Sequence, residues 1–324
     1  MKSYWIVTKG HEAVLELRDV PEPKPKRDEV VVRVHASALN RGELFVGGAV
    51  HGGPEKLGGS ECSGVIHALG EGVTGWKVGE RVMGRARGTW APYAVMEAAQ
   101  VLPMPSRLTW EQAAAIPSSF LTSYEAIVRL GRLEKGEWLL VLGASSGVGV
   151  GAIQIAQVLG AHSIGTSGSA QKLEKLKSIG LDVGICTRAP DFSAKVREAT
   201  GGKGANVALN LVGASVFPEI LRSLAYQGRV AIVGYVDGKF SAEIDLNAVH
   251  VNRFDIFGVS NTKLPAEQRS LATRGFERDI LPALVDGRVT PLVDRVFGFD
   301  ELPAAKHHME SDAMAGKIVV NVAA

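Results

Sequence analysis

The feature that most constrains the fold is a buried strand followed by a glycine-rich turn and a helix. Residues 138–142, WLLVL, form an unbroken apolar run after the charged turn at 134–137, which is typical of a parallel strand covered on both faces. The next seven residues, GASSGVG, are small or glycine, and apolar residues then recur at helical spacing until Gly160. This order predicts a helix N-terminus whose unpaired N–H groups favour a pyrophosphate. We therefore expect a dinucleotide to bind at Gly143, Ser145, Ser146, Gly147, Val148 and Gly149; a tight turn that binds nothing is the alternative.

Length and composition describe a globular protein of about two domains. The chain has 324 residues, of which 46% are hydrophobic and 22% charged, and its formal net charge is +2. This balance gives no reason to expect a polyanionic partner. The N-terminal segment alternates like a strand, and no run of about 18 apolar residues occurs, so we expect a cytoplasmic protein without a membrane segment. Cys62 and Cys186 lie far apart in apolar settings, and we expect both to be buried, reduced thiols.

The pattern of segments divides the chain. Up to about residue 103, short β segments such as 30–34, 64–70 and the end of 76–82 alternate with turns, which predicts a β-barrel-like unit. From 136 to 259 strands alternate with helices, which predicts a doubly wound parallel sheet of the Rossmann type. Its six strands are expected at 138–142, 161–165, 183–186, 206–211, 229–233 and 254–259. Beyond it we expect a mainly helical segment at 264–286, a strand at 293–299, a helix at 300–310 and a strand at 317–322.

Several phrases resemble the zinc-independent quinone oxidoreductases, the zeta-crystallin-like branch of the medium-chain dehydrogenase/reductase superfamily. They are VHASALN at 34–40, GGSECSGVIHALGEGVTGWKVGERV at 58–82 and GTWAPYAVMEAAQVLPMP at 88–105, with the spacing Gly143-x-x-Ser146-x-x-Gly149. Ser146 departs from the family's usual glycine and adds a hydroxyl near the phosphates. The resemblance implies an α/β fold with a GroES-like β-barrel catalytic domain over residues 1–122 and a Rossmann NADPH-binding domain over 123–262. It also implies a return segment over 263–324 that completes the first domain, and an active site in the cleft between the domains.

The resemblance also bears on a metal. In the zinc-dependent members of the superfamily, the ligands of the catalytic metal fall where this chain has Asn40, Ser60 and Ser118. Amide and hydroxyl oxygens are poor zinc ligands compared with thiolate and imidazole, and two cysteines cannot supply the four of the structural zinc lobe. We therefore expect no metal site. Glu61 keeps the carboxylate of the zinc enzymes' G-H-E phrase, and a structural carboxylate hydrogen-bonded to backbone is the favoured interpretation.

Three residues are candidates for catalysis. By the resemblance, Asn40 lies beside the nicotinamide ribose, where its amide could bond a ribose hydroxyl and a substrate carbonyl. His51 is the only side chain between Leu44 and Pro54 that could move a proton at neutral pH, although an exposed loop histidine can equally be inert. Thr122 matches the family's threonine beside the nicotinamide, or it only bonds back along its own helix.

Further cofactor contacts are expected where later strands end, because ligands of an open sheet sit at the carboxyl ends of its strands. The family's G-K pair before the last strand adds one more. The residues concerned are Val212, Gly234, Gly258, Ser260 and Lys317. Ordinary turn glycines and a strand-capping lysine are the alternatives.

The end of the second strand distinguishes the two nicotinamide cofactors. NAD-preferring sites place an acid about 20 residues past the glycine turn, but no acid occurs between Glu137 and Glu174. Hydroxyls, N–H groups and a positive charge are instead offered by Ser167, Gly168, Ser169 and Lys172. The sequence therefore predicts NADPH. The alternative is that Ser169 only caps the next helix while Lys172 belongs to a solvated face.

Taken together, these features predict a zinc-free, NADPH-dependent reductase that transfers hydride to a quinone. A reductase of α,β-unsaturated carbonyls is one alternative, and a non-catalytic NADPH-binding sensor or structural protein is another. We expect a small-molecule substrate, no nucleic-acid or membrane partner, and a homodimer paired through the sheet edge at 253–259.

Overall fold

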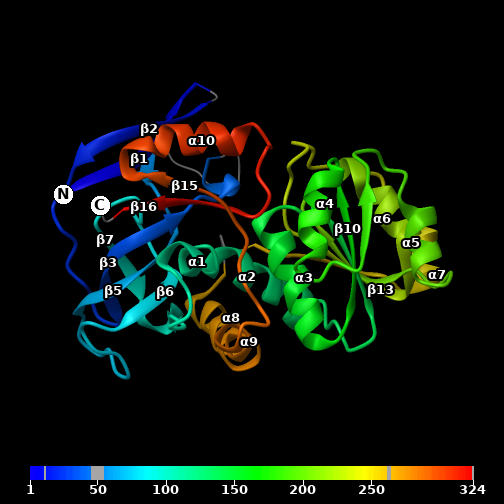
Figure 1. Ribbon diagram of the computed structural model, residues 1–324. Coiled ribbons are helices and arrows are strands. Elements are labelled where there is room, and N and C mark those ends of the chain that lie inside the picture. Colours follow the sequence, from blue (N-terminus) through cyan, green and yellow to red (C-terminus); the bar gives the residue numbers. More distant parts are fainter. Residues whose placement is uncertain (11, 45–54, 261–263, 323–324) are drawn as a thin grey trace. The chain divides into compact units, whose positions relative to one another are not determined.

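The computed structural model describes residues 1–10, 12–44, 55–260 and 264–322, and the chain forms two compact units (Figure 1). Unit 1 contains Met1–Ser119, Thr262–Val285 and Pro291–Ala324, and unit 2 contains Phe120–Asn261 and Asp286–Thr290. The domain boundaries expected at 122/123 and 262/263 stay a prediction.

Unit 2 is built on a six-stranded parallel sheet with the strand order β11-β10-β9-β12-β13-β14. Counted along the chain this is 3-2-1-4-5-6, the order of a Rossmann fold, so the predicted doubly wound sheet is confirmed. Its strands are β9 (Trp138–Leu142), β10 (His162–Ser167), β11 (Val183–Cys186), β12 (Ala205–Asn210), β13 (Leu224–Ile232) and β14 (Asp255–Gly258). β13 begins earlier than the predicted residue 229, because Leu224 pairs with Ala205 before an irregularity shifts the register.

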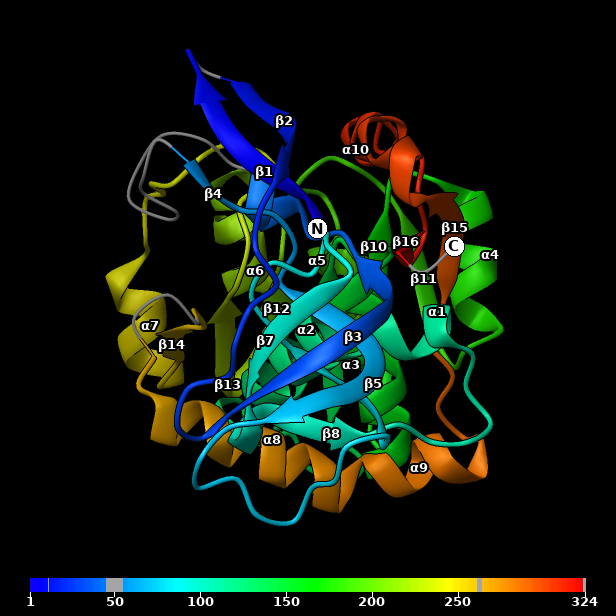
Figure 2. The same cartoon turned by 90° about the vertical axis from the view of Figure 1, so that its left-hand side faces the viewer.

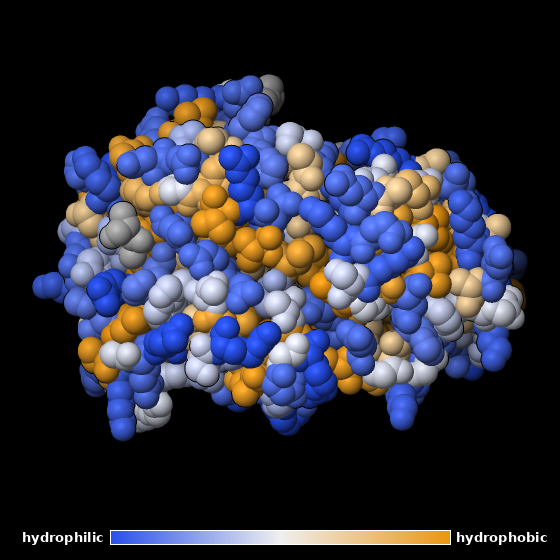
Figure 3. All heavy atoms as spheres, in the orientation of Figure 1, coloured by the Kyte–Doolittle hydropathy of each residue, from blue (hydrophilic) through white to orange (hydrophobic). Residues whose placement is uncertain are grey.

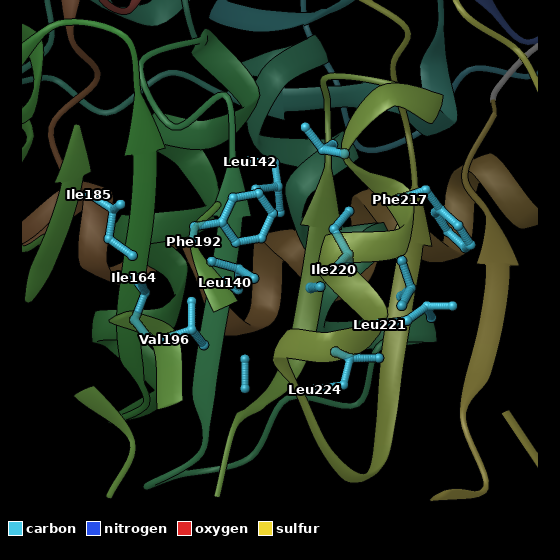
Figure 4. Close-up of a cluster of buried hydrophobic side chains, with 14 residues drawn as sticks. Leu140, Leu142, Ile164, Ile185, Phe192, Val196, Phe217, Ile220, Leu221 and Leu224 are labelled. Atoms are coloured by element: carbon cyan, nitrogen blue, oxygen red, sulfur yellow. The ribbon is translucent and has the colours of Figure 1, made fainter. Parts of the chain in front are cut away.

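Helices separate these strands. They are α3 (Gly147–Leu159), α4 (Ala170–Lys177), α5 (Ser193–Ala199), η4 (Ala214–Val216), α6 (Phe217–Ser223) and α7 (Leu246–Asn252), preceded by the π-helical segment η3 (Tyr124–Leu130). A buried apolar cluster packs α5 and α6 onto the sheet. In Figure 4, Phe192 lies beside Leu140 and Leu142 of β9, and only 1% of its surface is exposed.

Replacing Phe192 tests this core. We expect Phe192→Ala to lower the free energy of unfolding by about 3–5 kcal/mol, because it removes an aromatic ring from a closely packed interior. Phe240, which is 69% exposed in the same unit, is the matched control, and Phe240→Ala should cost about 1 kcal/mol or less. Urea unfolding monitored by circular dichroism measures both changes. Equal losses for the two variants would contradict the packing described.

Unit 1 contains a seven-stranded and a three-stranded sheet. The larger follows the path β15-β16-β3-β5-β6-β8, with β7 also paired to β3, and its neighbours are antiparallel except for β15 and β16. These strands are β3 (Glu29–Ala38), β5 (Glu61–Leu69), β6 (Arg81–Arg85), β7 (Tyr93–Glu97), β8 (Val101–Pro103), β15 (Val293–Gly298) and β16 (Lys317–Asn321). The smaller sheet holds β1 (Lys2–Lys9), β2 (Glu12–Asp19) and β4 (Glu55–Leu57).

The helices of unit 1 are short at its N-terminal end and longer at its C-terminal end. They are η1 (Arg41–Leu44), η2 (Ala98–Gln100), α1 (Trp110–Ala114), the start of α2 (Pro117–Ser123), α8 (Ala266–Asp279), α9 (Leu281–Asp286), η5 (Phe299–Glu301) and α10 (Leu302–Glu310). The helical and strand segments expected beyond residue 263 are therefore confirmed. β6 starts at Arg81, so the strand expected at the end of the segment 76–82 is present.

The C-terminal strand pairs with the N-terminal half of the chain. β16 runs antiparallel to β3 with Val319 opposite Ala38, and β3 lies next to β5 (Figure 2). This register carries Lys317, the first residue of β16, past the end of β3. Leu39 and Asn40, which follow β3, therefore lie within hydrogen-bonding distance of Lys317.

The two cysteines differ, which corrects the expectation that both are buried. Cys62 is fully buried in β5, and burial raises the pKa of its thiol. Cys186 is exposed. It is the last residue of β11, an edge strand, so the sheet covers it on one side only.

The surface is largely polar. Hydrophilic side chains predominate on the face shown in Figure 3, and apolar ones lie among them in small groups. Within the described ranges, no helix has both the length and the apolar character that a membrane span requires. β14 is the last strand of its sheet and pairs with β13. The homodimer expected at this edge stays a prediction.

Candidate active site

The turn between β9 and α3 gathers the predicted phosphate-binding residues. Gly143 adopts φ +79°, a left-handed conformation that favours glycine. A Cβ on Gly149 would lie 2.4 Å from the carbonyl oxygen of Ala144, so glycine is needed where helix and turn meet. Ser146 is the N-cap of α3, and its Oγ accepts a hydrogen bond from Gly149 N at 3.1 Å. The first N–H groups of α3 have no carbonyl acceptor within their own helix, and such groups suit a phosphate. Ser145, Gly147 and Val148 belong to this same segment.

The residues expected at the end of the second strand form a hydroxyl-lined loop. Ser167 ends β10, and its Oγ accepts from Ser169 N at 3.3 Å. Ser169 caps α4, because its Oγ accepts from Lys172 N at 3.3 Å. Ser169 therefore has the helix-capping role that was the alternative to phosphate binding. It does not exclude a phosphate, since a hydroxyl that accepts one hydrogen bond can still donate its own proton.

Arg188 joins this loop and was missed from the sequence. β11 pairs in parallel with β10, with Cys186 opposite Ser167, so the residues after the two strands lie side by side. A Cβ on Gly168 would lie 2.2 Å from Arg188 Nε, which shows that the arginine side chain passes directly over this glycine. A basic residue just after the third strand was the available signal. This signal points to the loop after β10 only when the pairing of β10 with β11 is known.

The loops after β12 and β13 are held together by hydrogen bonds. Asn210 Oδ1 accepts from the backbone N atoms of Val212 and Gly213, both at 3.0 Å. Asp237, in the loop after β13, accepts from Ser215 N and Lys239 N at 2.8 Å each. Partial burial acts against ionisation, yet the hydrogen bonds from Ser215 and Lys239 keep the pKa of Asp237 below its usual value.

The remaining candidates of unit 2 occupy the predicted strand ends. Gly234 follows β13, and a Cβ there would lie 2.9 Å from Leu211 O. Gly258 is the last residue of β14, and a Cβ there would have no neighbouring atom within 4 Å. Ser260, two residues later, is exposed. Thr122 is half-buried in α2. Its neighbour Ser123 donates from Oγ to Val148 O at 2.7 Å and so ties α2 to α3.

Unit 1 contains a partly buried polar cluster around Asn40. Asn40 Nδ2 donates to Glu61 Oε1 at 2.8 Å and to Glu43 Oε1 at 2.7 Å, and Ser60 Oγ lies 3.4 Å away. Asn40 Oδ1 accepts from Lys317 Nζ at 2.8 Å. The ammonium on one side and the carboxylates on the other fix the orientation of the amide. A role for Asn40 in binding ribose or substrate stays a prediction. Such a contact would use the second lone pair of Asn40 Oδ1, or it would replace one of the hydrogen bonds described here.

Lys317 and Glu61 form the charged centre of this cluster. Lys317 Nζ donates to Leu39 O at 2.7 Å and to Asn40 Oδ1 and Glu61 Oε1 at 2.8 Å each, so all three of its N–H bonds are used. Their side chains are 5% and 0% exposed. Glu61 Oε2 accepts from the backbone N of Ser118 at 2.7 Å, which agrees with the structural interpretation of this carboxylate. A direct bond from Lys317 to a cofactor stays a prediction and requires one of its contacts to be exchanged.

Glu43 belongs to the same cluster and was missed as a site residue. It lies in η1, where its backbone N donates to Asn40 O at 3.0 Å. Its Oε1 accepts from Asn40 Nδ2 and from Ser60 Oγ, the latter at 2.5 Å. The signal was the spacing of an acid three residues after Asn40, which brings both side chains to one side of a helical turn. His51 lies outside the described residues.

Comparison with known proteins agrees with this architecture. Residues 26–106 match the family model described as alcohol dehydrogenase GroES-like domain, and residues 147–274 match the model described as zinc-binding dehydrogenase. Human quinone oxidoreductase is 30% identical over 281 residues, which are 84% of this chain and 84% of that protein. The chain belongs to the medium-chain dehydrogenase/reductase superfamily, among the relatives of quinone oxidoreductase. The predicted pairing of a GroES-like and a Rossmann domain is confirmed.

Two further similarities are informative. Highly-reducing polyketide synthase 1 of Aureobasidium melanogenum is 33% identical over 304 residues, which are 92% of this chain. The chain spans only 14% of the length of this synthase and of a Mycobacterium tuberculosis polyketide synthase subunit that it also matches. The solved structure of mycobacterial Rv1454c complexed with NADPH has a TM-score of 0.88 and 26% identity, covering 99% of this chain and all of that one.

The ion pair at the centre of the cluster can be tested by a double-mutant cycle. We expect Lys317→Met to lower the free energy of unfolding by about 3–5 kcal/mol, because it leaves Glu61 charged and unpaired in the interior. Adding Glu61→Gln should recover part of this loss, since the unpaired charge is then removed. Lys306→Met is the control, because Lys306 pairs with Glu310 in the more exposed α10 at 2.6 Å, and such pairs contribute about 0.3–0.5 kcal/mol. Chemical unfolding of the wild-type protein, Lys317→Met, Glu61→Gln and the double variant gives the cycle. A loss in Lys317→Met no larger than that in Lys306→Met would refute the assigned role.

Proposed function

We propose that this chain is an oxidoreductase that uses NADPH to reduce a quinone without the help of zinc. The observation that carries the choice of cofactor is the loop after β10. It offers two serine hydroxyls and the cations Lys172 and Arg188, and it lacks the carboxylate that would repel a 2′-phosphate. The NADPH complex of mycobacterial Rv1454c supports the same choice.

The donor set around Asn40 supports chemistry without zinc, although one matched family model is named for that metal. Zinc sites use thiolate, imidazole and carboxylate ligands, usually four of them. The cluster instead offers an amide, a hydroxyl and two carboxylates, and the Lys317 ammonium lies 2.8 Å from Glu61 Oε1. A divalent cation there would have to displace that ammonium. Within the described ranges, no three His, Cys, Asp or Glu side chains gather as a metal site would require.

In this proposal the chain supplies binding and positioning. Bound NADPH would provide the hydride. The N-terminus of α3 would hold the pyrophosphate, and Ser167, Ser169, Lys172 and Arg188 would hold the 2′-phosphate. The loops that Asn210 and Asp237 fix after β12 and β13 would border the nicotinamide end at the sheet's carboxyl edge.

A reductase of enones or enals is the second candidate. It is favoured by the similarity to a highly-reducing polyketide synthase along almost the whole of this chain. A third candidate, an NADPH-binding protein without turnover, would need the same cofactor loop but no acceptor.

Steady-state oxidation of NADPH with a panel of acceptors distinguishes these functions. We expect turnover with quinones, unchanged by a metal chelator, because the cluster's donors suit hydrogen bonding better than zinc. Turnover with enones or enals alone would move the assignment to the second candidate. Lack of turnover with every acceptor would favour a binding protein, and one tightly held zinc per chain, lost together with activity, would refute the zinc-free proposal.

Charge reversal at the loop after β10 tests the cofactor. We expect Lys172→Glu and Arg188→Glu each to weaken NADPH binding by roughly tenfold or more, about 1.4 kcal/mol or above, while NADH binding hardly changes. The physical reason is that only NADPH carries a 2′-phosphate to be repelled. Lys195→Glu, the same change on the exposed part of α5, is the matched control. Fluorescence titration measures all affinities, and equal losses for both cofactors, or a wild-type preference for NADH, would show that the loop is wrongly assigned.

A further inference from the structure

The larger sheet of unit 1 carries a hollow that the proposed function does not use. Its volume is about 350 Å³, which is within the range of small-molecule sites. β3 lies between β5 and β7, and all three strands contribute to the lining (Figure 2). The lining shares no residue with the cluster around Asn40 or with the cofactor loops. The hollow is therefore a separate candidate site, contained within unit 1.

Strand register places an arginine in the middle of this hollow. Arg33 of β3 lies opposite Val65 of β5 and opposite Tyr93 of β7, and residues that are opposite in antiparallel strands project from the same face. Val32 and Val34 are buried on either side of Arg33, so the arginine projects away from the core. The sheet thus presents an aliphatic, a charged and an aromatic side chain next to one another.

One wall of the hollow is the loop that precedes β6. Gly79 N donates to Ile66 O at 2.9 Å, and Ile66 N donates to Glu80 O at 3.0 Å, so this loop is fixed along β5. The loop holds Val78 at the hollow, where 62% of the valine is exposed. An apolar surface open to solvent is a favourable contact for the ring of a ligand.

A second wall is aromatic. The ring of His67 lies against that of Tyr93, with 4.7 Å between their centroids. His67 Nε2 lies 3.0 Å from Glu22 Oε1, so this carboxylate is engaged by the histidine and not by Arg33. Aromatic side chains favour another ring in a tilted or offset arrangement. The hollow therefore combines apolar and aromatic contact surface around one cation.

The positive charge of Arg33 is not matched by the protein. Within the part of the chain that the structure describes, its guanidinium makes no ion pair and no hydrogen bond. Arg81 of β6 lies opposite Val65, so a second guanidinium belongs to the same row of side chains. Burial lowers the pKa of His35, and the charges of Arg33 and Arg81 lower it further. The field at this face is thus favourable to an anion.

We propose that this hollow binds a small aromatic carboxylate. The Arg33 guanidinium would donate two parallel hydrogen bonds to the carboxylate, which is the geometry in which arginine recognises this group. The ring of the ligand would lie over Val65 and against Tyr93. An aliphatic acid would gain only the first of these interactions, and a neutral aromatic molecule only the second. The site requires neither NADPH nor a quinone.

Calorimetric titration of the full chain with 2-naphthoate tests the site. We expect saturable binding of one molecule per chain with a Kd of about 1 mM or below. Two matched probes separate the interactions, because 2-naphthamide keeps the rings without the charge and acetate keeps the charge without the rings. Each should bind roughly tenfold more weakly or worse. Added NADPH should leave the affinity for 2-naphthoate unchanged, since the lining contains no residue of the cofactor loops.

Substitutions locate the binding. Arg33→Gln should weaken binding of 2-naphthoate by roughly tenfold or more and leave 2-naphthamide unaffected, and it should fold because Arg33 is exposed. Arg295→Gln is the matched control, because Arg295 is exposed on β15 of the same sheet and lies 4.7 Å from the ring centroid of Phe297 but does not line the hollow. Val78→Asp adds a like charge at the loop and should weaken binding of the acid alone.

Several results would overturn the proposal. They are a lack of saturable binding up to about ten times the expected Kd, equal effects of Arg33→Gln and Arg295→Gln, and equal affinities for the acid and the amide. Displacement of 2-naphthoate by NADPH would place the acid at the cofactor loops and would overturn the site as well. A wild-type protein that reduces no quinone would refute the proposed function and leave this binding site intact.

Discussion

A buried ammonium group organises the polar interior of unit 1. Lys317 Nζ is almost free of solvent, and removing a charge from water is expensive unless the protein replaces its hydration. Here a backbone carbonyl, an amide oxygen and a carboxylate replace it, and they come from the end of β3 and the start of β5. The pairing of β16 with β3 provides the register that brings these acceptors within reach. The first strands and the last strand of the chain therefore depend on each other at this point.

The same pairing sets the electrostatics of the cluster. Because Lys317 neutralises Glu61, a second carboxylate in the same interior has no counter-charge within hydrogen-bonding distance. Glu43, the other carboxylate of the cluster, accepts hydrogen bonds from Asn40 and Ser60 instead. A low-dielectric interior supports a fully paired charge and disfavours an additional unpaired one.

Unit 2 gathers groups that are suited to anions. Its serines combine two tasks, since Ser146 and Ser169 cap α3 and α4 while keeping a hydroxyl proton to donate. Arg188 adds charge to the loop after β10 from the neighbouring strand, where it passes over Gly168. Helix termini, hydroxyls and cations are all complementary to anions, so the three features act in the same direction.

Local sequence patterns determined the elements of this protein and many of its candidate residues. The apolar run at 138–142, the glycine turn after it and the acid-free segment before Glu174 are visible along the chain, because each depends on neighbours only a few residues away. Periodicity likewise gave the six strands of the parallel sheet, while the start of β13 escaped it because a register irregularity has no local pattern.

Only the tertiary structure decided which distant residues meet. It brought Lys317 to Asn40, Arg188 to Gly168 and Glu43 into a cluster with Glu61, and it left Cys186 exposed at a sheet edge. Each of these results depends on how strands that are far apart in the sequence pair and in which register. Register is set by packing summed over whole sheets, so no short stretch of sequence contains it.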